Sequence, residues 1–260
     1  MSRRAQPDRD FPWWLLAVGL LLGTAYVVVL LDDGARQVLT TLRRGIGITV
    51  FVTLVGFAAA SLIGLGLALM SLSRWIVLRQ LARFYVEIVR GIPILVLLLY
   101  VAFVFAPALV ALWNWLGLPE MRTRDFSLLW RAILALVIAY SAFIAEVFRA
   151  GLQSVDPGQI EAAKALGLKR WHRFRHIVMP QAIRTILPPL GNDFVAMVKD
   201  SSLVSVVGVL DIAQLGKLTA AGNFRYFETY NVVALLYLTM TVLLSLGLRR
   251  LERALAQKHG

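Results

Sequence analysis

Polar or charged residues interrupt an apolar stretch between about residues 186 and 209, and six of them could contact a polar solute. They are Asn192, Asp193, Lys199, Asp200, Ser201 and Ser202. At about 1.5 Å per helical residue from Arg184, Asp193 would lie about 13 Å into a bilayer and Lys199 about 22 Å. Ionisable groups at such depth cost several kcal/mol unless paired or hydrated, which makes them functional candidates. We therefore expect either a pathway for a polar solute or an internal pair, Asp193 with Lys199 or with a neighbouring helix.

Catalytic and metal-binding patterns are weak in this sequence. His172 and His176 are spaced i, i+4 but have no evident third ligand, so surface histidines are the simpler interpretation. Gly216-Lys217 resembles the end of a phosphate-binding loop, but Asp211 replaces the first glycine and Leu218 replaces the magnesium-binding Ser or Thr. Cysteine is absent, which excludes thiol nucleophiles and zinc–thiolate clusters. We expect no enzyme centre, no metal and no cofactor.

The composition is that of a membrane protein. Apolar residues make up 59% of the chain and charged residues 16%, whereas soluble domains are about 45–50% apolar. The net charge of +12 would suggest a nucleic-acid partner in a soluble protein. Here the basic residues lie between long apolar runs, so membrane topology explains them and no nucleic acid is expected.

Six runs could cross a bilayer, whose core of about 30 Å requires about 20 helical residues. Five are apolar over nearly their full length: Trp13–Leu31, Gly47–Met70, Ile92–Trp113, Leu128–Phe148 and Val232–Leu248. The sixth, from about 186 to 209, contains Pro188 and Pro189, and we expect these residues to break the helix. The sequence thus predicts an all-α integral membrane protein with about six transmembrane helices.

The distribution of Lys and Arg predicts the orientation. The first run follows Arg3 and Arg4 but is long and lacks a small-x-small cleavage site, so we interpret it as a retained anchor. Segments 1–12, 71–91, 149–184 and 249–260 then face the cytoplasm and carry 18 of the 27 Lys and Arg residues. This bias agrees with the positive-inside rule and predicts cytoplasmic tails at 1–12 and 251–260.

Two further groups of charges lie near the predicted membrane boundaries. Arg74, Arg79, Arg83 and Arg90 alternate with apolar residues and indicate an amphipathic interfacial helix, in which Glu87 lies one turn before Arg90. Glu146 and Arg149 are spaced i, i+3 and most simply form a local salt bridge.

A short helix is predicted between the fourth and fifth runs. Asp156 suits the N-cap, Pro157 the first helical position, Gln159 the third position of a capping box, and Gly167 a left-handed stop. Helix 157–166 would be about 15 Å long, too short to cross a membrane, so it lies outside the bilayer. After it, residues 169–180 place aromatic residues on one face and cations on the other, a pattern that faces lipid or a neighbouring helix. A docking helix and a plain connecting loop both fit these residues.

The loop sequence narrows this choice through a resemblance. Glu161-Ala162-Ala163, then Gly167, then Ile177, Met179 and Pro180 resemble the EAA loop of ABC importer permeases. The flanks 145–155 and 180–184 and the run 199–203 resemble the branch for polar amino acids (His/Glu/Gln type), and the similarity covers roughly residues 45–255. The chain departs from the family at Ser201, where Thr is usual, and at Val96 and Leu97, where Gln often stands.

The resemblance implies a five-helix MetI-like core over 45–250, with its EAA loop at 154–184 and an accessory helix at 13–31. It also implies a multi-pass permease subunit of the bacterial inner membrane, surrounded by lipid and paired with a second permease of the same or a sister type. A periplasmic amino-acid-binding protein would deliver the substrate, and a cytoplasmic ATPase dimer would hydrolyse ATP. The residues that would contact the ATPase are Ile160, Glu161, Ala162, Ala163, Leu166 and Gly167.

Two other classes of membrane protein, secondary transporters and intramembrane enzymes, fit the sequence less well. A secondary transporter also uses broken helices and midplane charges, but it would usually have more spans or an internal repeat. An intramembrane enzyme would need a nucleophile or metal set inside a span, and all three histidines lie outside the predicted spans.

Overall fold

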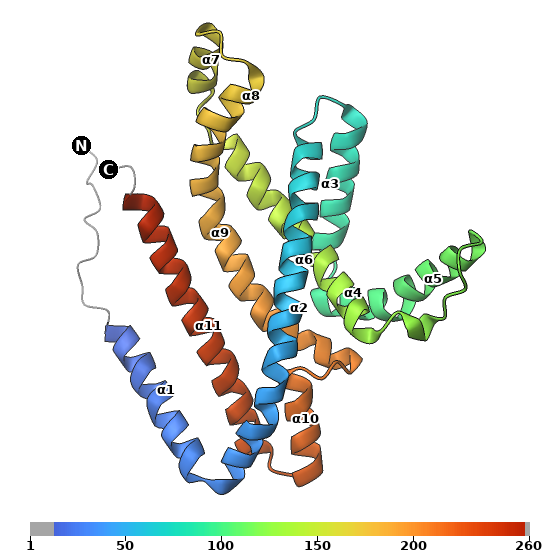
Figure 1. Ribbon diagram of the computed structural model, residues 1–260, viewed down its shortest axis with the longest axis vertical. Helices are drawn as coiled ribbons and strands as arrows, with labels where there is room; N and C mark the ends of the chain where they lie inside the picture. The colour runs from blue at the N-terminus through green and yellow to red at the C-terminus, as the bar shows by residue number, and fades with distance from the viewer. Residues whose placement is uncertain (1–12, 258–260) are drawn as a thin grey trace.

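The computed structural model describes residues 13–257, with side chains as far as Glu252. The N-terminal tail 1–12 and the last residues of the C-terminal tail lie outside the described part. Within it the chain is helical and contains no strand (Figure 1). The α-helices are α1 (Trp13–Leu31), α2 (Asp33–Ser71), α3 (Ile76–Gly91), α4 (Ile94–Tyr100), α5 (Ala106–Trp115), α6 (Leu128–Gln153), α7 (Pro157–Ala165), α8 (Arg170–Arg173), α9 (Met179–Asp200), α10 (Ile212–Asn223) and α11 (Tyr226–Gln257). Shorter π and 3-10 segments are η1 (Val101–Phe105), η2 (Thr123–Asp125), η3 (Phe174–Val178) and η4 (Ser201–Val207).

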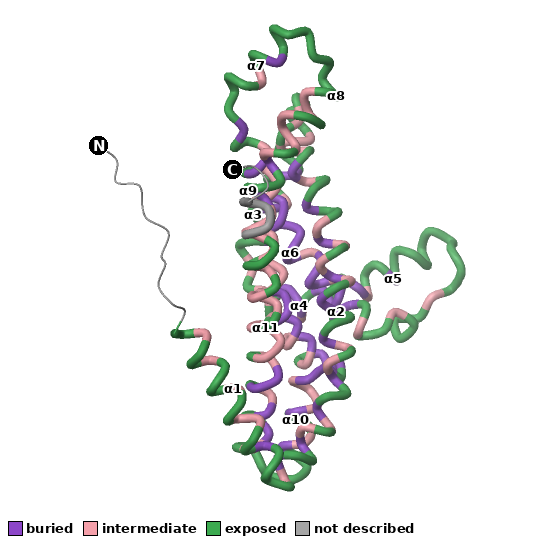
Figure 2. Tube along the Cα trace, turned by 60° about the vertical axis from the view of Figure 1, so that its left-hand side comes forward, coloured by how far each residue is buried: buried purple, intermediate pink, exposed green. Residues whose placement is uncertain are grey.

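The centre of the bundle is the packing of α2 against α6. Gly56, Ala60, Gly64 and Ala68 recur every four residues on α2 and are all buried, and α6 contributes several buried alanines to the same core. Small residues at this spacing allow two helix backbones to approach closely. A Cβ on Gly64 would lie only 3.0 Å from the carbonyl oxygen of Ser141, so the closest approach requires glycine. Figure 2 shows the buried residues gathered along this central part of the bundle.

Five helical segments of the described chain are long and apolar enough to cross a membrane. They are α1, α2, the run from α4 to α5, α6 and α11. α9 corresponds to the sixth predicted span and packs against α6 and α11 (Figure 1). α1 contacts α2 and α11, and Val29 is its single buried residue, so this helix adds little to the core.

α2 is longer than predicted. The predicted span begins at Gly47, whereas the helix begins at Asp33. Asp32 caps it by accepting a 2.7 Å hydrogen bond from the Ala35 N–H. Its first turns bury Val38 and Leu42 in a second apolar cluster with α10 and α11. Hydropathy identified the apolar part of this helix but missed its half-buried, partly charged beginning.

The predicted break of the sixth span at Pro188 and Pro189 is wrong. α9 continues through both prolines as an α-helix. Each proline removes one backbone donor, yet its fixed φ is close to the helical value, and packing against α6 and α11 supports the helix on both sides of the prolines. The α-helix ends later, at Asp200, where η4 begins; Gly208 with φ +86° then turns the chain.

Candidate functional site

The short helix after α6 has the predicted ends. Asp156 is the N-cap and its side chain accepts a 2.8 Å hydrogen bond from the Gly158 N–H. At the other end Gly167 has φ +74° and its N–H donates to the Lys164 carbonyl over 2.9 Å, while the Leu168 N–H donates to the Ala163 carbonyl over 3.1 Å. This pair of bonds is a Schellman motif. α7 is therefore a separately capped helix of nine residues.

The predicted capping box at the start of α7 is wrong. The Gln159 side chain reaches away from its own helix, and its Oε1 accepts a 2.6 Å hydrogen bond from Nε2 of Gln181 on α9. A long amide side chain can bond either to the end of its own helix or to a neighbouring helix, and here it bonds to the neighbouring helix α9. This bond joins the first turn of α7 to α9.

The predicted ATPase-contacting residues divide into two groups. Glu161, Ala162, Leu166 and Gly167 are exposed, and Leu166 is 81% exposed although it is large and apolar. Ala163 is buried and Ile160 is half-buried. α7 lies with α8 at one end of the bundle, well away from α10 (Figure 1).

α7 is held firmly on the helices beneath it. Val155, just before α7, packs with Ala182 and Ile186 of α9 in a small apolar cluster that also includes Ile160. At the end of α6, a Cβ on Gly151 would lie 2.2 Å from the side chain of Ile186, so α6 and α9 almost touch there. A displacement of α7 would therefore be passed to both α6 and α9.

The basic-aromatic segment after α7 is continuous with α9. The sequence analysis treated residues 169–180 as a separate short segment, whereas α8 leads through the π-helical turn η3 directly into α9. Trp171 and Phe174 stack with ring centroids 5.9 Å apart, and Trp171 remains 63% exposed. His172 and His176 also stack, at 5.9 Å, and no group of three metal-binding side chains occurs in the described part of the chain.

The predicted pathway residues of α9 differ in burial. Asp193 and Asp200 are seven residues apart, close to two helical turns, and both are half-buried. Oδ2 of Asp200 accepts a 2.7 Å hydrogen bond from the Tyr140 hydroxyl of α6, whereas Oδ2 of Asp193 is buried without a hydrogen-bond partner. Lys199 is exposed and lines a separate cavity of about 230 Å³ between α1, α9 and α11.

The alternative of an internal Asp193–Lys199 pair is not formed: both side chains are described, and no ion pair joins them. Ser201 is buried, and its hydroxyl donates to the Val198 carbonyl of its own helix over 2.7 Å. Ser202 is half-buried and Asn192 is exposed. Of the six predicted residues, Asp200 is hydrogen-bonded to α6, and Asp193 lies two turns before it on α9.

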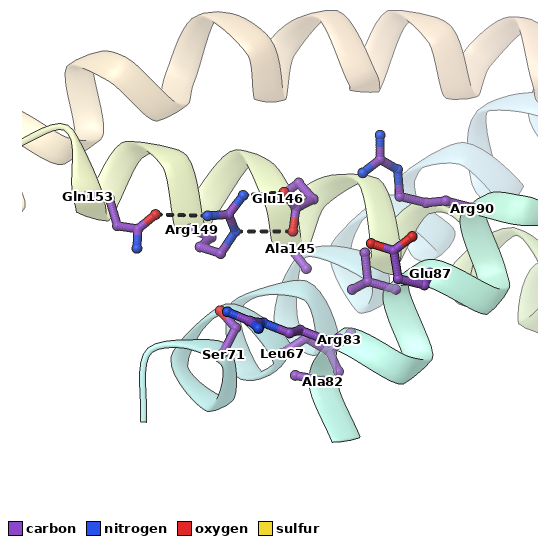
Figure 3. Close-up of a pocket in the computed structure, with 11 residues that line it drawn as sticks. Leu67, Ser71, Ala82, Arg83, Glu87, Arg90, Ala145, Glu146, Arg149 and Gln153 are labelled. Carbon is purple, nitrogen blue, oxygen red and sulfur yellow. Dashed lines mark hydrogen bonds and ion pairs between the residues drawn. The ribbon is translucent and has the colours of Figure 1, made fainter. Parts of the chain in front are cut away.

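A charged cavity of about 350 Å³, not predicted from the sequence, lies between α2, α3 and α6. We call it the α3–α6 pocket (Figure 3), and it is lined by Leu67, Ser71, Ala82, Arg83, Val86, Glu87, Arg90, Ala145, Glu146, Arg149 and Gln153. Arg83, Glu87 and Arg90 recur along one side of α3, and that i, i+4, i+7 spacing was the available signal. α3, the helix predicted to be amphipathic, packs along α2 and α6.

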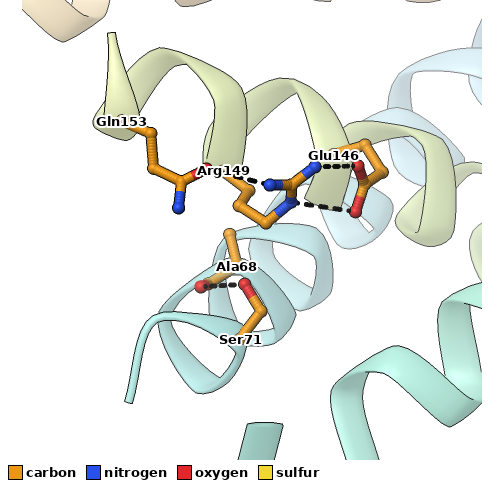
Figure 4. Close-up of polar contacts among 5 residues, drawn as sticks. All are labelled: Ala68, Ser71, Glu146, Arg149 and Gln153. Atoms are coloured by element: carbon orange, nitrogen blue, oxygen red, sulfur yellow. Dashed lines mark hydrogen bonds and ion pairs between the residues drawn. The ribbon is translucent and has the colours of Figure 1, made fainter. Parts of the chain in front are cut away.

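The α6 side of this pocket carries the predicted local salt bridge. Nε of Arg149 donates to Oε1 of Glu146 over 3.1 Å, and Nη2 donates to Oε2 over 2.5 Å. Nη1 of the same guanidinium donates to Oε1 of Gln153 over 2.8 Å (Figure 4). The bidentate pair fixes the last turns of α6 just before the chain enters α7.

A buried carboxylate that was not among the predicted site residues lies at the end of the bundle opposite α7. Asp211 is fully buried, caps α10 through the Gln214 N–H at 2.8 Å and accepts a 2.9 Å hydrogen bond from the Tyr237 hydroxyl of α11. Gly45 of α2 lies against its backbone. Gly216-Lys217 is inside α10, so these residues are not in a phosphate-binding loop.

Comparisons with known proteins agree with this architecture. The family model described as "Binding-protein-dependent transport system inner membrane component" matches residues 60–259. The probable amino-acid permease protein YxeN of Bacillus subtilis (strain 168) is 35% identical over 221 residues, which cover 84% of this chain and 93% of that protein. The glutamine transport system permease protein GlnP of Escherichia coli (strain K12) is 37% identical over 214 residues, 82% of this chain and 91% of that protein.

Solved structures confirm the predicted fold. "Crystal structure of an amino acid ABC transporter with histidines" has a TM-score of 0.70 and 35% identity, covering 83% of this chain and 94% of that chain. A structure of the MetNI methionine ABC transporter has a TM-score of 0.65 at 22% identity, which supports the MetI-like fold alone. The short capped helix, the small-residue packing of α2 on α6, and these matches together place the chain in the family of binding-protein-dependent transport system inner membrane components.

Proposed function

We propose that this chain is the permease subunit of an ATP-driven importer for a polar amino acid of the glutamine type. A periplasmic binding protein delivers the amino acid, and a separate cytoplasmic ATPase dimer drives the cycle. The names of the relatives support the amino-acid substrate. The permease works as a dimer with a second permease in the inner membrane, and both its termini are cytoplasmic.

The observation that carries this proposal is the placement of α7. It is too short to cross a membrane, it is capped at both ends, and it presents Glu161, Ala162 and Leu166 on the surface at one end of the bundle. A large apolar side chain exposed at the tip of such a helix fits a partner surface better than water. α7 is the element through which the ATPase is coupled.

The contacts beneath α7 suggest how ATP would drive movement. When the ATPase dimer closes, it displaces α7, and the Gln159–Gln181 bond and the Val155 cluster pass this displacement to α9. α9 carries Asp193 and Asp200, whose carboxylates can pair with the ammonium group of an amino acid in transit. Tilting α9 against α6 would change the access of this site from one side of the membrane to the other.

Reconstitution of the permease with its candidate ATPase and binding protein tests this proposal. Leu166→Glu should abolish ATPase binding and uptake, because it places a charge on the apolar tip of α7 without disturbing the core. The matched control is Leu218→Glu, the same change at an exposed residue of α10 (52% exposed) at the other end of the bundle. Uptake without ATP, or undiminished ATPase binding by the Leu166→Glu protein, would overturn the proposal.

A further inference from the structure

We infer that the α3–α6 pocket is a second binding site for a free amino acid, separate from Asp193 and Asp200. The inference rests on the proposed function for the choice of amino acid. Its physical basis is the arrangement of charges on three helices.

α3 has distinct sides that direct its charges into the pocket. Ala82, Val86 and Val89 are buried against α2 and α6. Arg83, Glu87 and Arg90 lie beside this buried stripe and line the same cavity as the α6 residues Glu146 and Arg149 (Figure 3). The remaining surface of α3 is apolar and exposed at Val77, Leu81 and Phe84, which suits contact with lipid.

The charges of the pocket are only partly compensated. Glu146 and Arg149 neutralise each other on α6. Arg90 lies over the Phe143 ring at 5.8 Å, and its charge also acts on Glu146. Arg83 and Glu87 make no hydrogen bond or ion pair with any described residue. Arg83 and Glu87 are exposed and lie in the wall of the cavity, so a small solute can reach both charges from the predicted cytoplasmic side.

A zwitterion satisfies both kinds of charge at once. The α-carboxylate of an amino acid matches a planar guanidinium such as Arg83 or Arg90, and its α-ammonium matches Glu87. An anion alone would leave Glu87 without a partner, and a cation alone would leave the arginines without one. The volume of about 350 Å³ is at the lower end of the range of small-ligand pockets, about 300–1,000 Å³, as expected for a free amino acid.

The position of the pocket links its occupancy to α7. Gln153, held by Arg149, lines the pocket only three residues before Asp156, the N-cap of α7. A ligand that bridges α3 and α6 would restrain the end of α6 from which α7 emerges. Because this end is the predicted cytoplasmic side, the ligand would be the imported amino acid itself, acting back on the coupling helix.

The absence of cysteine allows a site-specific test. Ser71→Cys places one thiol in the pocket wall, and Thr40→Cys places a control thiol on the exposed early part of α2. In the permease–ATPase complex in nanodiscs of phosphatidylcholine, L-glutamine should slow maleimide labelling at position 71 and not at position 40. N-acetylglutamine, which lacks the ammonium, and glutaminamide, which lacks the carboxylate, should not protect.

Second-site variants decide where protection arises. Glu87→Gln should raise the glutamine concentration for half-protection by about tenfold or more, the expected effect of losing a charged partner. An unchanged midpoint of thermal unfolding shows that the variant is folded. Asp193→Asn should leave protection unchanged.

The inference fails if glutamine up to about 10 mM, enough to fill a millimolar site, gives no protection. It also fails if Asp193→Asn removes the protection, or if only added phosphatidylethanolamine protects. If glutamine protects position 71 in a protein that shows no ATP-driven uptake, the result supports this second site and rejects the proposed function.

Discussion

The hydroxyl of Tyr140, in the middle of α6, donates a 2.7 Å hydrogen bond to Oδ2 of Asp200, the last residue of α9. This bond fixes the end of α9 at the point where the chain changes from an α-helix to the 3-10 segment η4. Asp193 lies two turns earlier on α9 and has a buried oxygen without a partner. One carboxylate is therefore anchored to α6, whereas the other has a buried oxygen whose hydrogen-bonding capacity is unused.

Tyr140→Phe should lower stability by about 1–3 kcal/mol, because it removes the hydroxyl that donates to the half-buried carboxylate of Asp200. The substitution keeps the ring and therefore keeps the packing of this residue, which is 3% exposed. Thermal unfolding of the purified permease measures the effect. Uptake should fall as well, while ATPase binding through α7 is retained. An unchanged midpoint of unfolding would mean that Asp200 finds another donor.

Asp193→Asn should leave stability unchanged or raise it slightly, because it removes a charge that no described side chain neutralises. Uptake should nevertheless be lost, since the neutral amide no longer attracts an ammonium group. Asp33→Asn, the same change at an exposed carboxylate at the start of α2, is the control and should retain uptake. Loss of stability in Asp193→Asn with normal uptake would show a purely structural carboxylate.

Features determined by nearby residues could be predicted from the sequence, whereas those that depend on helix packing could not. Long apolar runs located the spans, and the ends of α7 followed from Asp156 and Gly167, whose preferences are local. The continuity of α9 through Pro188 depended on support from other helices. The α3–α6 pocket brings Glu87 close to Glu146, 59 positions later in the chain, and no spacing rule relates two such positions.

The Gln159–Gln181 bond should couple ATP hydrolysis to transport. Gln159→Ala leaves the N-cap of α7 intact, because Asp156 caps the helix without help from Gln159. We expect ATPase binding to persist while the amount of amino acid imported per ATP hydrolysed falls. A double-mutant cycle with Gln181→Ala measures the link: the double variant should be no worse than either single variant. Fully additive losses would show that the two side chains act independently.

The small-residue contact between α2 and α6 can be tested with two glycines on one helix. Gly64→Ala should destabilise the protein by about 1–3 kcal/mol, because the new methyl group would lie 2.9 Å from Ile144 Cγ2 and 3.0 Å from the Ser141 carbonyl oxygen, which forces the helices apart. Gly66→Ala is the matched control, since nothing lies within 4 Å of its Cβ position, and the better helix propensity of alanine should stabilise the protein by about 0.5–1 kcal/mol. Thermal unfolding of both variants measures the difference. Equal shifts in the same direction would show that the approach of α2 to α6 does not depend on the missing side chain at Gly64.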